Sequence, residues 1–159
     1  MTGSKSAFFA LVICAGAAAL EGALAGRSIR ARFGALRLPR FSPSLSVWFL
    51  IGAAYYVMCF AILYRLLSSN LPSNKHRVVF ILLLIFMAAN AAWGFLFFRR
   101  KDLRASFLAF FPYGFVTLVL MLMLQSIDPI SALLLAPYFA YLGYAVWWAH
   151  RVWVLNRAP

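Results

Sequence analysis

The chain has 159 residues, of which 65% are hydrophobic and 11% are charged, and its mean hydropathy is +0.89. A typical soluble domain is about 45–50% apolar and about 25% charged, so this composition excludes water as the main solvent. Two cysteines and nine glycines in the chain also exclude a disulfide scaffold and a collagen-like fibre. The remaining class is a membrane protein that crosses the bilayer several times.

The net charge is +12, from fifteen Lys and Arg residues against three Asp and Glu residues. Such an excess of positive charge can mark a protein that binds nucleic acid. Here the basic residues lie mostly between apolar segments, and no segment has the composition of a soluble domain that could hold a phosphate backbone. We therefore expect no nucleic-acid partner, and we expect anionic lipid headgroups of the bilayer to neutralise these charges.

Five apolar segments are long enough to cross a hydrocarbon core of about 30 Å, which takes about 20 helical residues. They cover approximately residues 7–26, 45–67, 78–98, 105–125 and 130–154. Their continuous apolar character favours helices over barrel strands, which alternate and need only about 9–11 residues. Asp128 and Pro129 are typical of an N-cap followed by proline, so the last helix is expected to begin there. The sequence thus predicts one all-α membrane domain over residues 1–159, a bundle of five transmembrane helices.

The basic residues are distributed unequally between the two sides that five spans define. The amino terminus and the second and fourth loops carry four of them, namely Lys5, Arg65, Lys75 and Arg77. The first and third loops and the carboxyl terminus carry eleven, namely Arg27, Arg30, Arg32, Arg37, Arg40, Arg99, Arg100, Lys101, Arg104, Arg151 and Arg157. By the positive-inside rule the second side faces the cytoplasm. We expect a multi-pass protein of an inner (cytoplasmic) membrane with its carboxyl terminus in the cytoplasm.

Few residues in the chain suit catalysis or metal binding. Cys14 and Cys59 lie in separate spans, where we expect them to be small buried hydrophobic side chains. His76 and His150 have no second ligand at helical spacing, and the sequence contains no glycine-rich phosphate loop and no nucleophile elbow. We therefore expect no metal site and no catalytic residues, and hence a binding protein rather than an enzyme.

Glu21 is the one acidic residue within a predicted span. A carboxylate inside a membrane is by default a functional candidate, because burying its charge in hydrocarbon is costly. It lies near the basic end of its span, so two interpretations remain open. Either it pairs with Arg27 or reaches the membrane interface, or it has a role in a ligand cavity or in proton handling.

Aromatic residues make up 18% of the chain. Tryptophans near span ends fit belts at the membrane interface; these are Trp48, Trp147, Trp148 and Trp153. On the third span Asn90, Trp93 and Phe97 recur at i, i+3 and i+7, which places them on one helix face. A similar stripe on the fifth span consists of Tyr138, Tyr141, Ala145 and Trp148. These stripes either pack helices together, with the amide bonding between helices, or line a pocket for a flat, largely apolar molecule with few polar groups.

Four segments of the chain, in order, carry a resemblance to a known family. They are CAGAAALEGALAG in the first span, LPRFSPSLSVWFLIGAAYY in the first loop and second span, AANAAWGFLFF in the third span, and the pair Pro137 and Tyr138 in the fifth. With the five-span layout, they are similar to the translocator protein family, the TspO/MBR or tryptophan-rich sensory proteins, also called peripheral benzodiazepine receptors.

The resemblance implies a compact bundle of five helices, often a homodimer, with a pocket between the helices and under the first loop. Members of that family bind porphyrins, including protoporphyrin IX and haem, and animal members bind cholesterol and benzodiazepine-type drugs. Carried over by position, the residues that would bind the ligand are Tyr56, Asn90, Trp93, Phe97, Tyr138 and Tyr141. Arg40 stands where the family has an aromatic residue, and we hypothesise that it pairs with a porphyrin propionate.

We therefore expect a membrane receptor or carrier that binds a porphyrin or haem as its ligand, for transport or for sensing, with no obligatory cofactor. Two alternatives remain. One is an enzyme that degrades the bound porphyrin with light or oxygen, in which Trp93 would be the redox-active ring. The other is a structural subunit of a membrane assembly.

Small residues repeat every four positions in the first span, at Ala18, Gly22 and Gly26, and in the third, at Ala88 and Ala92. Ridges of small side chains let helices approach closely. They therefore favour a homodimer, or else close packing inside one chain.

Overall fold

A computed structural model describes residues 3–69 and 74–157, and these residues are almost entirely helical with no strand. Five helical stretches are long and apolar enough to span a membrane: Gly3–Ala25, Leu45–Ser68, Asn74–Arg99, Leu103–Ile127 and Pro129–Leu155. Each coincides with a predicted span to within a few residues. The predicted all-α bundle of five transmembrane helices is confirmed.

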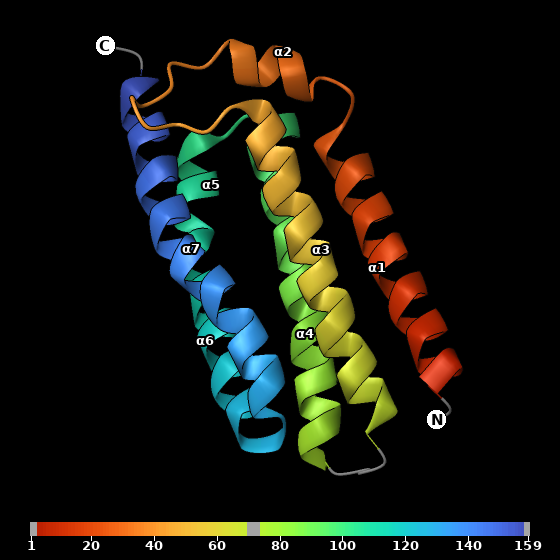
Figure 1. The fold of residues 1–159 in the computed structure, drawn as a ribbon. Helices are drawn as coiled ribbons and strands as arrows, with labels where there is room; N and C mark the ends of the chain where they lie inside the picture. Colours follow the sequence, from red (N-terminus) through yellow and green to blue (C-terminus); the bar gives the residue numbers. More distant parts are fainter. Residues whose placement is uncertain (1–2, 70–73, 158–159) are drawn as a thin grey trace.

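The elements in chain order are α1 (Gly3–Ala25), α2 (Ile29–Gly34), α3 (Leu45–Ser68), α4 (Asn74–Gly94), the π-helix η1 (Phe95–Arg99), α5 (Leu103–Leu108), α6 (Phe110–Ile127) and α7 (Pro129–Leu155). Figure 1 shows the long helices running along a common direction, with the short helix α2 lying across one end of the bundle. That end also holds the junction before α5 and the end of α7, whereas the opposite end holds the start of α1 and the turn between α6 and α7 (Figure 1). The eleven basic residues of the first and third loops and the carboxyl terminus therefore gather at the α2 end.

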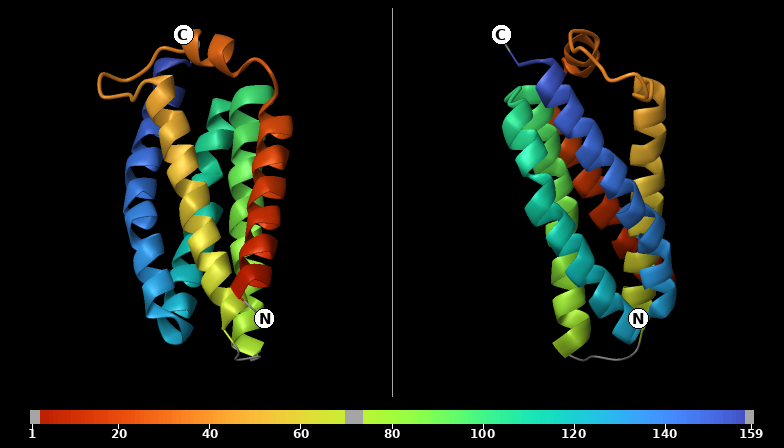
Figure 2. Two further views of the ribbon diagram at one scale, coloured as in Figure 1. Left: turned by 45° about the vertical axis from the view of Figure 1, so that its right-hand side comes forward. Right: turned by 90° about the vertical axis from the view of Figure 1, so that its left-hand side faces the viewer.

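The long helices form a closed ring of neighbours. Helix α1 packs against α3 and α4, α4 against α6, α6 against α7, and α7 against α3. The two views of Figure 2 show α1 and α3 close together near the start of the chain and apart beneath α2. The Ser6 hydroxyl donates to the carbonyl oxygen of Leu67 at 3.1 Å, which ties α1 to α3 at the close end. The splay of these two helices leaves room inside the bundle at the α2 end.

A glycine ends α1 and starts the turn into α2. Gly26 has a φ of +79°, a left-handed conformation that glycine adopts without strain, and its N–H donates to the carbonyl of Gly22 at 3.1 Å. The chain then crosses the end of the bundle as α2, where the Phe33 ring stacks on Trp148 of α7 with centroids 6.5 Å apart. The first loop is thereby packed onto the helices.

Two of the spans contain irregular turns that the sequence pattern did not reveal. The third span widens into η1, where the Arg100 N–H donates to the carbonyl of Phe95, five residues earlier, at 2.9 Å. The fourth span breaks at Ala109, between α5 and α6. Pro112 has no N–H to bond the carbonyl of Leu108, which explains the break at this point. By contrast α7 begins at Pro129, as predicted, and continues as one helix through Pro137.

Candidate functional site

A cavity of about 330 Å³ lies between the helices at the α2 end of the bundle. Ligand pockets in proteins usually measure about 300–1,000 Å³, so this volume suits a small organic molecule. Residues of α1, α2, α3, α4, η1, α6 and α7 line it, and most of the lining side chains are apolar or aromatic. The splay of α1 from α3 provides the space, and α2 covers the end of the cavity with Ile29 and Phe33.

Four aromatic rings form a continuous row along the part of the cavity wall nearest α2. The Trp93 ring stacks on Phe97, with centroids 5.1 Å apart and planes inclined by 14°. Phe97 contacts Trp148 at 5.6 Å, and Trp148 contacts Trp48 at 4.8 Å. The π-helix contributes to this wall, because its wider turn brings both Phe97 and Phe98 to the cavity. Such a row offers a broad apolar surface on which a flat molecule can stack.

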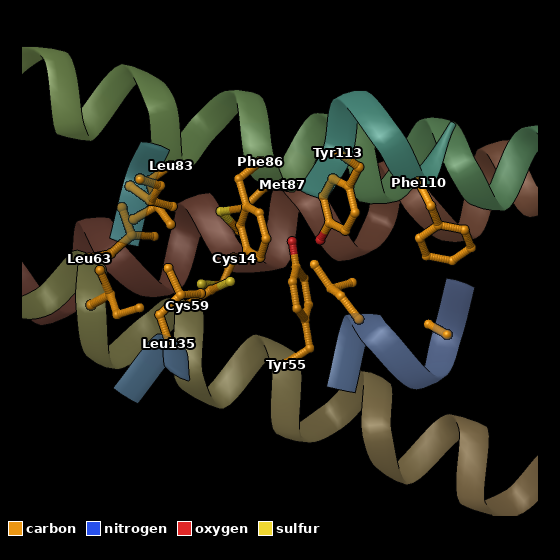
Figure 3. Packing of buried hydrophobic residues seen from close by; sticks show 14 of the residues in the cluster. Cys14, Tyr55, Cys59, Leu63, Leu83, Phe86, Met87, Phe110, Tyr113 and Leu135 are labelled. Carbon is orange, nitrogen blue, oxygen red and sulfur yellow. The ribbon is translucent and has the colours of Figure 1, made fainter. Parts of the chain in front are cut away.

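Tyrosine rings form the opposite part of the wall, farther from α2. The hydroxyls of Tyr113 and Tyr138 lie 2.9 Å apart in a hydrogen bond that joins α6 to α7. The Tyr113 ring stacks on Phe86 with centroids 5.2 Å apart, and Tyr55 contacts Tyr138 at 5.1 Å. Figure 3 shows Tyr55 and Tyr113 approaching each other from opposite sides of the bundle. Buried hydroxyls in an apolar wall provide the few oriented polar groups that binding pockets use.

Glu21 of α1 is the acidic group of this cavity. The Tyr56 hydroxyl of α3 donates to its Oε2 at 2.6 Å, and Nδ2 of Asn90 on α4 donates to the same oxygen at 3.0 Å. The ion pair found within residues 3–69 and 74–157 joins Arg65 to Asp128, so Glu21 does not pair with Arg27 there. Of the two interpretations of Glu21, the structure therefore favours a place in the cavity.

The polar atoms of Trp93 and Asn90 are held by the protein in different ways. The indole Nε1 of Trp93 donates to the carbonyl oxygen of Ser106 at 3.1 Å, which fixes the ring and leaves its face as the part available to a ligand. Asn90 uses Nδ2 on Glu21, and its carbonyl oxygen accepts no hydrogen bond from the described part of the chain. The Asn90 side chain can therefore still accept a hydrogen bond from a ligand.

Six of the seven residues predicted to bind a ligand line this one cavity: Tyr56, Asn90, Trp93, Phe97, Tyr138 and Tyr141. The seventh, Arg40, does not line it. Arg40 is exposed in the turn that the hydrogen bond from the Ser42 N–H to the carbonyl of Pro39 closes at 3.0 Å. It lies in a loop that connects α2 to α3, and a loop position gives no periodicity from which its direction could be predicted.

The first loop is held onto α7 by hydrogen bonds on both sides of Arg40. The Arg37 N–H donates to Oδ1 of Asn156, and Nδ2 of Asn156 donates to the carbonyl of Arg37, both at 2.9 Å. On the other side Trp148 Nε1 donates to the Ser42 hydroxyl at 2.8 Å. These bonds fix the loop over the end of the bundle.

Sequence patterns missed part of the cavity wall. Tyr55 and Tyr113 line it, although neither belongs to a stripe that the periodicity singled out. The break at Ala109 interrupts the helical period of the fourth span, which concealed Tyr113. Trp48 and Trp148 are predicted belt residues, but both line the cavity, and Trp148 is only 1% exposed. Trp147, at 41% exposed, does face outward as a belt residue would.

Comparison with known proteins supplies the family. The model that describes the TspO/MBR family matches residues 8–154 of the 159-residue chain. The chain therefore belongs to the TspO/MBR family, and the resemblance found in its sequence is confirmed. No match was found among curated proteins. Family membership together with five apolar helices makes this an integral multi-pass membrane protein and supports a receptor or carrier role.

Proposed function

We propose that this TspO/MBR family protein is a membrane receptor or carrier that binds a tetrapyrrole, a porphyrin or haem, in the cavity between its helices. The observation that carries the proposal is the convergence of aromatic rings from α3, α4, η1, α6 and α7 on one cavity with few polar groups. A flat conjugated ring stacks on such surfaces, while isolated hydroxyl and amide groups fix its orientation.

The cavity has an open side, so a molecule larger than the enclosed volume can be bound in part. Ala18 and Gly22 of α1 and Phe49 of α3 line the cavity and are also exposed on the outside of the bundle. They belong to the last part of α1 and the first part of α3, the segments that are apart in Figure 2. A tetrapyrrole would place most of its ring against the aromatic wall and extend an edge through this opening.

The carboxylates of a porphyrin would lie toward the α2 end, where exposed arginines are concentrated. Arg40 remains our candidate partner for one propionate, at the surface of that end rather than in the cavity wall. If so, Arg40→Ala weakens binding of an acidic porphyrin and leaves binding of its dimethyl ester unchanged. Equal losses for the acid and the ester would rule out this role.

The test is a titration of tryptophan fluorescence with protoporphyrin IX, using the full chain in lipid nanodiscs. We expect saturable quenching at one porphyrin per chain. Trp93→Phe and Trp147→Phe are a matched pair, because both remove one indole but only Trp93 lines the cavity. Trp93→Phe should weaken binding about tenfold and Trp147→Phe should not change it. Absence of saturation, or equal effects of both substitutions, would contradict the proposal.

A second candidate function is light- or oxygen-dependent breakdown of the bound porphyrin. The observation that favours it is the ring row from Trp93 through Phe97 to Trp148, with neighbouring centroids 5.1 and 5.6 Å apart. Mixing protein and porphyrin in the dark without oxygen separates the two functions. Spectral shifts that reverse on removal of the porphyrin support binding alone, whereas irreversible bleaching that needs light and oxygen supports breakdown.

We also propose that the chain forms a homodimer through the outer face of α4. Ala88 and Ala92 are exposed one turn apart on that helix, and small side chains let two helices approach closely. In α1, by contrast, Ala18 and Gly22 border the cavity and Gly26 ends the helix. Ala92→Trp should therefore convert a dimer to a monomer in light-scattering measurements of the purified protein.

A further inference from the structure

We propose that Glu21 determines which charge a ligand can carry into the cavity. It selects flat ligands that present a hydrogen-bond donor or a protonated nitrogen to the interior, and it disfavours ligands that present a carboxylate there. The inference rests on the proposed function only for the location of the binding site. It adds the chemical class of the group that the interior of the site recognises.

Glu21 is the acid that lines the cavity, and no cation among the described residues pairs with it. The chain has three acidic residues. Asp128 forms an ion pair with Arg65, and Asp102 caps α5 by accepting a hydrogen bond from the Ala105 N–H at 2.8 Å. Glu21 receives only the neutral donors of Tyr56 and Asn90 among the described residues. A carboxylate in apolar surroundings is costly unless it is paired, so a donor or cation on the ligand gains from reaching it.

The carboxylate is also oriented so that one of its oxygens stays available. Both protein donors converge on Oε2, at 2.6 and 3.0 Å, and no donor from the described residues occupies Oε1. The stem of the side chain packs on Gly94 of α4, where an added Cβ would lie 3.8 Å from Cγ of Glu21. The side chain is therefore held from α3 and α4, with Oε1 left for a ligand in the cavity that Glu21 lines.

The charges around the cavity are arranged along its axis. The interior holds the carboxylate of Glu21, while the α2 end presents exposed Arg27, Arg30, Arg37 and Arg40. A ligand with both kinds of group fits in one orientation, with its donor inward and its acidic groups outward. A tetrapyrrole fits these charges only with its carboxylate edge toward the α2 end. A ligand with a carboxylate at its inner edge would meet Glu21 at close range in a medium of low dielectric constant.

The experiment compares three probes with one ring system, namely 9-aminoacridine, acridine and acridine-9-carboxylate. They are cationic, neutral and anionic at pH 7.5. Affinities for the full chain in phosphatidylcholine nanodiscs are measured by fluorescence, with empty nanodiscs as the reference for partition into lipid. We expect the wild type to bind 9-aminoacridine at least about tenfold more tightly than acridine-9-carboxylate.

Glu21→Gln keeps the size of the side chain and removes its charge, so it should abolish this preference while acridine binding is retained. Glu21→Asp keeps the charge and should retain the preference. Asp102→Asn is the matched control, since it removes one negative charge outside the cavity and asparagine also caps helices. It should leave the ratio of the two affinities unchanged.

The inference is overturned if the wild type prefers the acid, fails to bind the amine, or keeps the same ratio after Glu21→Gln. The wild-type measurement alone decides the matter if Glu21→Gln does not fold. Failure of the proposed function is a separate result. If protoporphyrin IX does not bind but the preference for the amine depends on Glu21, the inference holds without the tetrapyrrole. If protoporphyrin IX binds and Glu21→Gln changes nothing, only the inference fails.

Discussion

The two ends of the bundle are built from the same helices but packed in different ways. At the end near the start of the chain, aliphatic side chains fill the interior and are fully buried, among them Ile62, Leu63, Leu83, Leu124 and Leu135. At the α2 end, aromatic rings enclose a cavity of about 330 Å³. Figure 3 shows this succession, from Leu63, Leu83 and Leu135 on one side to Tyr55, Tyr113 and Phe110 on the other.

The difference teaches how a helical bundle can hold a pocket without losing its packing. Leucine and isoleucine side chains interdigitate and leave few voids, so the end near the start of the chain is a packed core. We call it the closed end. At the α2 end the aromatic rings are rigid, and the helices α1 and α3 are also apart (Figure 2), so the side chains leave a cavity between the helices. Gly22 and Gly52 line the cavity, and apart from the backbone of their own helix no atom lies within 4 Å of where a Cβ would stand. Packing at the closed end holds the helices in place, and the separation of the helices at the α2 end provides the space for the cavity.

The largest expected effect comes from removing volume at the closed end. Leu83→Ala should destabilise the protein by about 2–5 kcal/mol, because Leu83 is fully buried and its neighbours cannot fill the void. Leu142→Ala should cost less than half as much, because Leu142 already borders the cavity. Thermal unfolding of both variants in one detergent is the measurement. Equal costs would show that the two ends are packed alike.

A smaller effect is expected from the ion pair that ties α3 to the start of α7 at the closed end. The guanidinium of Arg65 donates two hydrogen bonds of 2.8 Å to the carboxylate of Asp128, which also accepts one from the Ser131 hydroxyl at 2.6 Å. Asp128→Asn should lower stability by about 1 kcal/mol, since the pair is partly exposed and screened by solvent. Ser126→Ala, an exposed change near the same turn, should have no measurable effect.

The same pair predicts a dependence on pH. Hydrogen bonds from Arg65, and then from Ser131, lower the pKa of Asp128 to about 2. The pKa of aspartate in the unfolded chain is about 3.9. The ionised carboxylate of Asp128 therefore contributes fully to the stability of the folded protein above about pH 4. That contribution is lost as the pH falls from about 4 through about 2. The difference in melting temperature between wild type and Asp128→Asn should shrink over this range, and a constant difference would contradict the assignment.

The smallest effect is expected where the open side of the cavity has space to spare. The methyl group of Gly52→Ala would meet no atom within 4 Å apart from the backbone of α3, so the change should alter stability by no more than about 1 kcal/mol, in the stabilising direction. Gly26→Ala is the contrast, because its φ of +79° strains any residue with a Cβ. Thermal unfolding should place the two variants on opposite sides of the wild type. A loss of stability in Gly52→Ala would mean that the cavity has no free space beside Gly52.

Much of the fold could be predicted from the sequence because hydrocarbon forces each segment to satisfy its own backbone hydrogen bonds. The predicted span over residues 45–67 and the observed helix Leu45–Ser68 differ by one residue for this reason. Helical periodicity also placed Asn90, Trp93 and Phe97 on one face, and all three line the cavity. Such a face is a local property of one helix.

The remaining features of the site depend on how separate helices are placed. The partners of Glu21 lie 35 and 69 residues away, on α3 and α4, so the sequence left open whether Glu21 pairs with Arg27 or enters a cavity. Tyr113 follows a helix break and has no clear period. Arg40 is in a loop, and its exposed position follows from the hydrogen bonds that hold that loop on α7.

By itself the sequence determined that the chain crosses a membrane five times and that eleven of its fifteen basic residues gather at one end. These properties add up residue by residue, because each apolar or charged side chain contributes its own transfer free energy between water and lipid. Only the tertiary structure decided that the rings enclose a hollow and that a carboxylate lies within it. Those features depend on the separation and rotation of helices that are distant in the chain, which no local pattern encodes.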